Sequence, residues 1–178
     1  MNKANIPYRH ATSAFEVDPS FFLNLGIKVV LCDLDNTLAF YGSSAPTPEC
    51  RAWVCKMKNA GIEVYICSNG LGKRVAKFGA ALNVPCAFFM RKPNPKPLLS
   101  LLKEKGWNKE EVILIGDQIQ TDVLAGNRAG IKVLLTEPLG KKEPPWTKWN
   151  RLFDKPKRRK LNKKGMLISW RVKENEQA

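Results

Sequence analysis

One stretch constrains the fold more than any other: a nearly uninterrupted apolar run, residues 27 to 32, that stops at Asp33 and Asp35. A run this apolar and β-branched predicts a strand buried on both faces of a parallel sheet, and such sheets bind ligands at the carboxyl ends of their strands. Two acids with one residue between them would repel there, so a cation, a shared proton or open water has to relieve them. We favour a hard divalent cation, and Mg2+ fits because it takes one or two carboxylates and leaves its other positions to water and phosphate.

The same residues have a simpler explanation, a strand that runs into a turn, because Asp and Asn are common turn residues. A string of the form Asp-x-Asp-x-Thr also arises by chance in on the order of a few per cent of chains of this length. The rest of the chain therefore has to decide between a turn and a functional site.

Apolar runs and amphipathic stretches alternate along the chain. Further strands are predicted at residues 62 to 67, 86 to 90, 112 to 115 and 131 to 135, and helices at 19 to 25, 48 to 60, 71 to 82, 98 to 105 and 121 to 129. Residues 1 to 17 predict no element. The alternation predicts an α/β fold, a Rossmann-like parallel sheet sandwiched between helices.

Polar residues follow four of these strands at the point where each strand ends. They are Asp33 with Asp35 and Thr37, Ser68 with Asn69, Lys92, and Asp117 with Asp122. Each has an ordinary explanation by itself, as a turn residue, a solvated charge or a helix cap. Together they offer the groups that phosphoryl transfer needs: a carboxylate nucleophile, a second carboxylate for proton transfer, a hydroxyl and an ammonium for phosphate oxygens, and acids for a metal.

At these positions the sequence resembles the haloacid dehalogenase-like (HAD) phosphatases. Asp33-Leu-Asp35-Asn-Thr37 looks like their first motif, Ser68 like the second, Lys92 in Lys-Pro-Asn-Pro like the third, and Gly116-Asp117-Gln-Ile-Gln-Thr-Asp122 like the fourth. The resemblance spans residues 27 to 135. The stretch from residue 116 to 130 is more narrowly similar to YqeG-type members of subfamily IIIA, relatives of the mitochondrial phosphatidylglycerophosphate phosphatase.

The resemblance implies a two-step hydrolysis. Asp33 would attack phosphorus to form an aspartyl-phosphate, while Asp35 protonates the leaving oxygen and then activates water. The implied phosphate-binding residues are Thr37, Ser68, Asn69 and Lys92. Mg2+ would be bound by Asp33, the main-chain carbonyl of Asp35 and Asp117, with Asp122 as a further ligand or as the partner that orients Lys92. Lys96 is a rival to Lys92, which we prefer because it directly follows a predicted strand.

The spacing between the motifs leaves no room for a cap domain. Thirty residues separate Thr37 from Ser68, and 23 separate Ser68 from Lys92. One helix and one strand use up each interval, so the HAD core is predicted without a cap. By family analogy, an open site admits a phosphate presented by something large, such as a bilayer, a protein or a nucleic acid.

Positive charge is concentrated at the carboxyl end of the chain. The net charge is +14, and residues 140 to 178 hold 13 Lys and Arg against 4 Asp and Glu, which is +9. We therefore predict a phosphatase domain with a short amino-terminal extension over residues 1 to 136 and a basic tail over residues 137 to 178. Trp146 and Trp149 interleave with the cations, a combination that suits an anionic membrane surface. Nucleic acid would also attract the tail, and a third option is that the tail packs back on the domain.

The sequence has no stretch of 18 apolar residues and no apolar signal core, so we expect a cytoplasmic protein, at most peripheral at the inner face of the membrane. Five cysteines without a Cys-x-x-Cys pair predict reduced thiols. A single histidine, His10, argues against zinc sites and triads built on histidine.

These features and the resemblance predict a Mg2+-dependent phosphomonoesterase acting on phosphatidylglycerophosphate in phospholipid synthesis. One alternative is a phosphatase of phosphoproteins or nucleic-acid ends. Another is a non-enzymatic RNA- or ribosome-binding module with a vestigial site, against which the intact acids argue. The sequence carries no signal for the oligomeric state.

Overall fold

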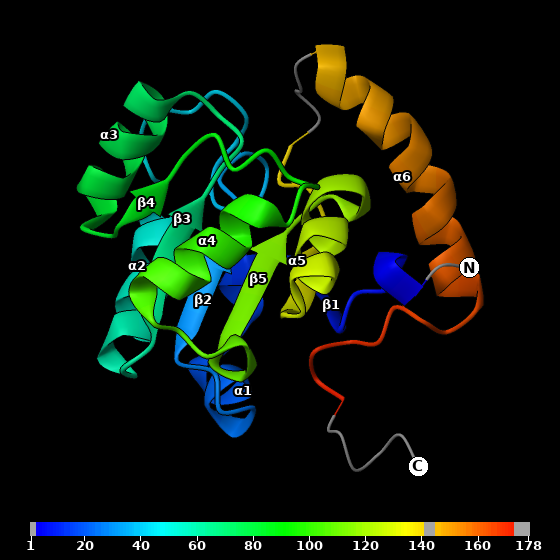
Figure 1. Cartoon of the computed structure of the whole chain (residues 1–178), viewed down its shortest axis with the longest axis horizontal. Helices are drawn as coiled ribbons and strands as arrows, with labels where there is room; N and C mark the ends of the chain where they lie inside the picture. The colour runs from blue at the N-terminus through cyan, green and yellow to red at the C-terminus, as the bar shows by residue number, and fades with distance from the viewer. Residues whose placement is uncertain (1–2, 141–144, 173–178) are drawn as a thin grey trace.

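β2 (Val29–Cys32), the strand predicted to end at the paired aspartates, lies inside a parallel sheet that has six strands within the described residues (Figure 1). The computed structural model describes residues 3–140 and 145–172, with the side chains of residues 145–151 outside that description. The strand order is β1-β6-β5-β2-β3-β4. The other strands are β1 (Arg9–Ala11), β3 (Glu63–Cys67), β4 (Cys86–Ala87), β5 (Val112–Gly116) and β6 (Lys132–Thr136). The predicted α/β class with a parallel sheet is confirmed.

The register of β2 explains why an uninterrupted apolar run was needed. Val30 pairs with Val64 of β3 on one side and with Ile113 of β5 on the other. Its neighbours along the strand alternate between two separate apolar cores, with Val30 and Cys32 in one and Val29 and Leu31 in the other. A strand between two partners and two cores has no surface left for a polar side chain.

The helices form one layer on each face of the sheet. The first core is covered by α1 (Pro19–Asn24), α2 (Pro48–Asn59) and α3 (Gly72–Leu82), and the second by α4 (Lys96–Lys105), α5 (Leu124–Ala129) and α6 (Pro145–Lys163). Side-chain caps begin two of these helices: the side chain of Asp18 accepts a hydrogen bond from the N–H of Ser20, and that of Thr47 accepts one from the N–H of Cys50. Each capping residue is followed by a proline in the first helical turn, as expected for a preset φ.

Within residues 1 to 136, three elements differ from the sequence prediction. β1 was not predicted; it pairs with β6 at the edge of the sheet. The strand predicted over residues 86 to 90 ends at Ala87, because Phe89 has a φ of +54°, which extended backbone does not adopt. The helix predicted over residues 121 to 129 is a π-helical turn, Ile119–Val123, followed by α5.

The carboxyl-terminal segment, predicted as a tail, contacts the domain through part of its described residues. Leu161 of α6 is fully buried in the second core. Beyond the helix, the chain returns to β1, where the N–H of His10 donates to the carbonyl of Ile168 at 2.8 Å and the N–H of Trp170 donates to the carbonyl of His10 at 2.9 Å. Figure 1 shows α6 flanking α5 at one side of the molecule.

The predicted membrane role of the tail depends on two tryptophans and on exposed cations. Trp146 and Trp149 have side chains outside the described part of the structure. Among the described side chains, the exposed cations of α6 and the residue after it are Lys155, Arg159, Lys160, Lys163 and Lys164. No helix among the described residues has the length and apolar character needed to cross a bilayer.

Replacing Leu161 with alanine is expected to lower the free energy of unfolding by about 2–5 kcal/mol, because a fully buried leucine leaves a cavity. Leu152 lies on the same helix and is 63% exposed, so Leu152→Ala is the matched control and should change stability by less than about 0.5 kcal/mol. Urea unfolding followed by circular dichroism measures both. Equal, small effects of the two substitutions would show that α6 does not pack on the domain in solution.

Candidate active site

The turn after β2 places Asp33 and Asp35 at the carboxyl edge of the sheet. The N–H of Asp33 still donates to the carbonyl of Ile115 in β5 at 2.8 Å, so this side chain is fixed by the sheet itself. The chain then reverses through Asn36, which has a φ of +63° and donates its N–H to the carbonyl of Ala39 at 2.7 Å. Asparagine tolerates this left-handed conformation better than most residues.

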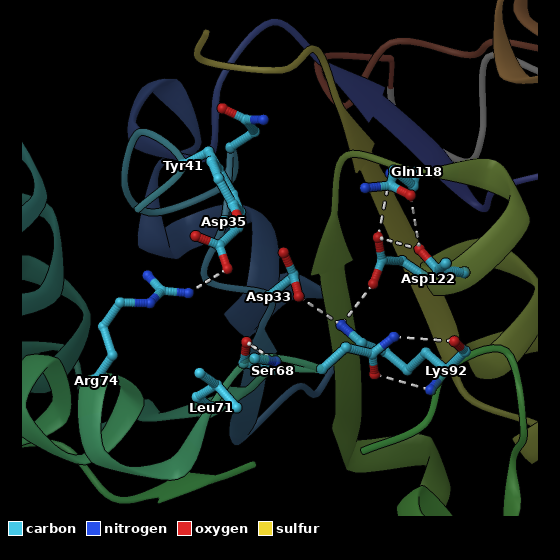
Figure 2. A pocket seen from close by; sticks show the side chains of 13 residues that line it. Asp33, Asp35, Tyr41, Ser68, Leu71, Arg74, Lys92, Gln118 and Asp122 are labelled. Atoms are coloured by element: carbon cyan, nitrogen blue, oxygen red, sulfur yellow. Dashed lines mark hydrogen bonds and ion pairs between the residues drawn. The ribbon is translucent and has the colours of Figure 1, made fainter. Parts of the chain in front are cut away.

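A pocket of about 370 Å³ opens at this edge of the sheet (Figure 2). Six of the predicted site residues line it, namely Asp33, Asp35, Ser68, Asn69, Lys92 and Asp122. A volume of this size lies in the range of small-ligand sites. The structure thus brings together residues from the ends of β2, β3, β4 and β5, as expected from the sequence.

A buried ammonium joins two of the carboxylates. Lys92 donates to Oδ1 of Asp33 at 2.7 Å and to Oδ1 of Asp122 at 2.6 Å. Its third hydrogen bond goes to the carbonyl of Cys67 at 2.9 Å. Because an ammonium has three donors, a direct bond from Lys92 to a phosphate requires one of these to be exchanged. Lys96, the rival candidate, is exposed at the start of α4 and does not line the described pocket.

The charges of these groups depend on one another. Burial raises the pKa of Asp33 to about 8, and repulsion from Asp122 and Asp117 adds to this, while Lys92 opposes it. Burial lowers the pKa of Lys92, but the carboxylates of Asp122 and Asp33 outweigh it and raise that pKa above its ordinary value. Lys92 therefore stays protonated and holds Asp33 in place.

The two residues after β3 have different tasks. The side chain of Asn69 clamps the backbone of Lys92, with Oδ1 accepting the N–H at 2.8 Å and Nδ2 donating to the carbonyl at 2.9 Å. Asn69 thus positions the lysine, and its predicted contact with phosphate stays a prediction. Ser68 accepts the N–H of Gly70 at 3.0 Å, which leaves its hydroxyl hydrogen to donate toward the pocket.

Asp122 is held close to the end of β5, and Gly116 makes this approach feasible. A Cβ atom at Gly116 would lie 2.3 Å from Cγ of Asp122, so no other residue fits there without moving the carboxylate. Oδ2 of Asp122 accepts the N–H of Gln118 at 3.1 Å and the hydroxyl of Thr121 at 3.2 Å. Its other oxygen, Oδ1, accepts a hydrogen bond from the ammonium of Lys92, so Asp122 is placed to orient the lysine.

Two residues of α6 brace the same loop. Asp154 is almost fully buried and accepts the N–H groups of Ile119 at 2.9 Å and Gln120 at 3.1 Å. Arg158 donates to the carbonyl of Asp117 and, at 2.8 Å, to the carbonyl of Thr136. The loop that carries the fourth motif is therefore completed by residues that the sequence assigned to the tail.

Asp35 forms an ion pair with Arg74 of α3, which lines the pocket (Figure 2). The sequence analysis did not assign Arg74 to the site. A signal was present, because Lys73 and Arg74 are cations in the first turn of a helix, where the helix dipole favours acids. A cation in that position needs a separate reason, and the carboxylate of Asp35 provides it.

Thr37 and Asp117 lie behind the pocket wall. Both are fully buried, and neither lines the described pocket. Among the described residues, no three acidic, histidine or cysteine side chains gather closely enough to hold a metal by themselves, so the four predicted ligands do not form one carboxylate cluster. The donor set still fits Mg2+, which uses one or two carboxylates, because Asp33 and Asp117 are hard oxygen donors close enough for their charges to interact.

A family model described as haloacid dehalogenase-like hydrolase matches residues 4–130. The chain belongs to this family, and the predicted enzyme class, a phosphatase of HAD type, is confirmed. The chain is 32% identical over 170 residues to the "Probable phosphatase YqeG" of Bacillus subtilis, a match that covers 96% of this chain and 98% of that protein.

More distant relatives agree with this assignment. The chain is 29% identical over 130 residues to phosphatidylglycerophosphate phosphatase 1 of Arabidopsis thaliana, which covers 68% of this chain but only 37% of the plant protein. Among solved structures, an uncharacterized protein from Listeria monocytogenes matches with a TM-score of 0.54 at 16% identity. The match covers 67% of this chain and 85% of the Listeria chain. That likeness is one of fold.

Replacing Asp154 with alanine is expected to lower the free energy of unfolding by about 1–3 kcal/mol, because two buried N–H groups lose their acceptor. Turnover of p-nitrophenyl phosphate should fall as well, since the unbraced loop carries Asp122. Asp154→Asn keeps one acceptor oxygen and should lie between the wild type and Asp154→Ala in both measurements. Unchanged stability and turnover in Asp154→Ala would show that other contacts hold the loop.

Proposed function

We propose that this phosphatase is a Mg2+-dependent phosphomonoesterase that works through an aspartyl-phosphate on Asp33 and acts on phosphatidylglycerophosphate. The observation that carries the reaction is the contact between Lys92 and Asp33 at the base of an open pocket, with Asp35 two residues away on its wall. Burial disfavours the ionised form of Asp33, whereas the positive charges of Lys92 and of a bound Mg2+ would favour it. In that form the carboxylate is fixed by one oxygen and can attack an incoming phosphorus with the other.

In the first step, Oδ2 of Asp33 attacks phosphorus while Lys92 keeps Oδ1 in place. Asp35 gives a proton to the leaving oxygen, and in the second step it takes a proton from the water that hydrolyses the aspartyl-phosphate. Arg74 orients Asp35 in the present structure. For proton transfer, Asp35 has to turn from Arg74 toward the bound phosphate.

The phosphate oxygens have donors on one side of the pocket. Ser68 offers its hydroxyl hydrogen, and Lys92 adds positive charge. The N-terminus of α3 lies beside them, since its N-cap residue Leu71 lines the pocket and makes no side-chain cap. Uncapped N–H groups at a helix N-terminus favour a bound phosphate.

Mg2+ would be held by the carboxylates of Asp33 and Asp117 and by the main-chain carbonyl of Asp35. When bound, it supplies positive charge that offsets the repulsion between Asp33 and the phosphate. The same charge would relieve the repulsion that Asp117 exerts on buried Asp33. These residues thus fit the role that the sequence predicted for them.

The choice of a lipid substrate is supported by the plant relative, whose name states this activity. The described structure also has no cap between its motifs, since α2 and α3 alone connect β2 to β3 and β3 to β4. An uncovered pocket suits a phosphate that projects from a large body. The exposed cations of α6 would attract an anionic membrane surface, where each contributes about 1 kcal/mol at low salt.

Asp33→Asn is expected to lower turnover of p-nitrophenyl phosphate by more than tenfold, a loss of over about 1.4 kcal/mol in transition-state stabilisation, because the amide has no nucleophilic charge. Asp35→Asn should be nearly as damaging. Melting temperatures near that of the wild type would show that both variants fold. An Asp33→Asn variant with more than about a tenth of the wild-type rate would exclude Asp33 as the nucleophile.

The substrate is tested by assaying the purified protein with Mg2+ on phosphatidylglycerophosphate in mixed micelles, on a phosphopeptide and on a 5′-phosphorylated oligonucleotide. We expect phosphate release from the lipid at the highest kcat/KM. EDTA should abolish it, and added Mg2+ should restore it. Turnover of the peptide or the oligonucleotide without turnover of the lipid would replace the lipid as substrate, and full activity in EDTA would exclude the metal.

A further inference from the structure

Exposed apolar side chains gather at the mouth of the pocket. Eight large apolar side chains are exposed among the described residues. Five of them lie on the segments that follow β2, β3 and β4 at the carboxyl edge of the sheet, and we name these the mouth rim: Phe40, Tyr41, Leu71, Phe88 and Phe89. Two of the five, Tyr41 and Leu71, also line the pocket (Figure 2). The apolar surface is therefore continuous with the site.

The mouth rim is held in shape by local contacts. Phe88 lies over Gly72, where an added Cβ would be 3.0 Å from its ring, so the glycine lets the ring come closer to the start of α3 than a side chain would. Phe88 and Phe89 meet edge to face, with ring centroids 5.5 Å apart. Phe89 is 52% exposed and has a φ of +54°, a strained backbone for an aromatic residue. Strain that keeps an apolar ring in water indicates a function for the exposed ring.

The segments after β3 and β4, which carry three of the five rim residues, are basic. Residues 68 to 103 contain seven Lys and Arg and no Asp or Glu. Lys92 and Arg74 are neutralised inside the pocket by Asp33, Asp122 and Asp35. Exposed cations remain beside the mouth rim at Lys73, Arg91 and Lys96. An apolar rim with exposed cations on the same segments is complementary to an anionic surface that has an apolar interior.

We propose that the mouth rim is a docking surface for a bilayer of anionic phospholipid, so that the pocket opens directly onto the headgroups. The proposal rests on the lipid phosphatase function proposed above and adds the part of the chain that meets the membrane. The rings of Phe88 and Phe89 and the side chain of Leu71 enter the interfacial region, and the bordering cations contact phosphate groups. A phosphate on a lipid headgroup then reaches Asp33 without leaving the bilayer.

A bilayer fits these side chains better than a nucleic acid does. Leu71, the most exposed of the five at 71%, is aliphatic and has no π-face for a base. Phe88 and Phe89 stand at 79° to each other and do not form a parallel platform for successive bases. Apolar side chains with adjacent cations are typical of interfacial membrane binding.

The test compares a double variant, Phe88→Ser with Phe89→Asn, with the control Leu23→Ser. Asparagine is chosen because it tolerates the positive φ of residue 89. Leu23 is 50% exposed, close to the 52% of Phe89, and lies on α1, which leads into the amino-terminal end of β2. Sedimentation with vesicles of phosphatidylglycerol and phosphatidylcholine in equal parts measures binding. Turnover of p-nitrophenyl phosphate measures the site without a membrane.

We expect vesicle binding of the double variant to fall by about tenfold or more, with turnover of the soluble ester within about twofold of wild type. Leu23→Ser should match the wild type in both. Vesicle binding of the double variant equal to that of the control would overturn the proposal. So would a parallel loss of soluble-ester turnover, or a loss of binding to a single-stranded oligonucleotide while vesicle binding is kept.

A second variant protects the test against a double variant that fails to fold. In Phe88→Trp the added fluorescence, taken as the difference from wild type, should be quenched by vesicles with brominated acyl chains. Absence of that quenching would overturn docking through the mouth rim. Vesicle binding through the rim without phosphate release from the lipid would support docking and reject the lipid as substrate. If the protein releases phosphate from the lipid while all rim variants bind vesicles like the wild type, the lipid substrate is supported and docking through the mouth rim is rejected.

Discussion

The rest of the site depends on one buried ammonium, that of Lys92. Asp33 and Asp122 point at the same small volume, and without a cation between them two buried carboxylates would repel at a cost of several kcal/mol. The neighbouring structure serves this contact: Asn69 fixes the backbone that carries the lysine, and Gly116 leaves space for Asp122 to approach. Asp33 is therefore positioned by an ion-pair network whose members follow β2, β4 and β5.

The location of the site could be predicted from the sequence, because parallel strands bring the residues that follow each strand to the same edge of the sheet. Each apolar run predicts a strand, each strand ends at the same edge of the sheet, and polar residues such as Ser68 and Asp117 follow directly. The local chemistry of the turns was also readable, as in the cap formed by Thr47. What the pattern could not show is how the groups pair. The clamp of Asn69 on Lys92 joins residues 23 positions apart through backbone atoms, which leave no mark on composition.

The elements missed are those whose cause lies elsewhere in the chain. β1 has only three residues, Arg9–Ala11, and becomes a strand because the edge of β6, more than a hundred residues later, offers hydrogen bonds. α6 presents so many cations that its composition indicates a solvated tail. Its buried side, marked by Asp154 and Leu161, is a minority of its residues and becomes evident only against the domain.

The brace from α6 has a consequence for the order in which the enzyme matures. Synthesis begins at the amino terminus, so all four motifs are made before Asp154 and Arg158. The loop of the fourth motif then lacks the acceptor for its N–H groups and the donor for the carbonyl of Asp117. The site as the structure shows it is therefore complete only once the last helix of the chain packs against this loop.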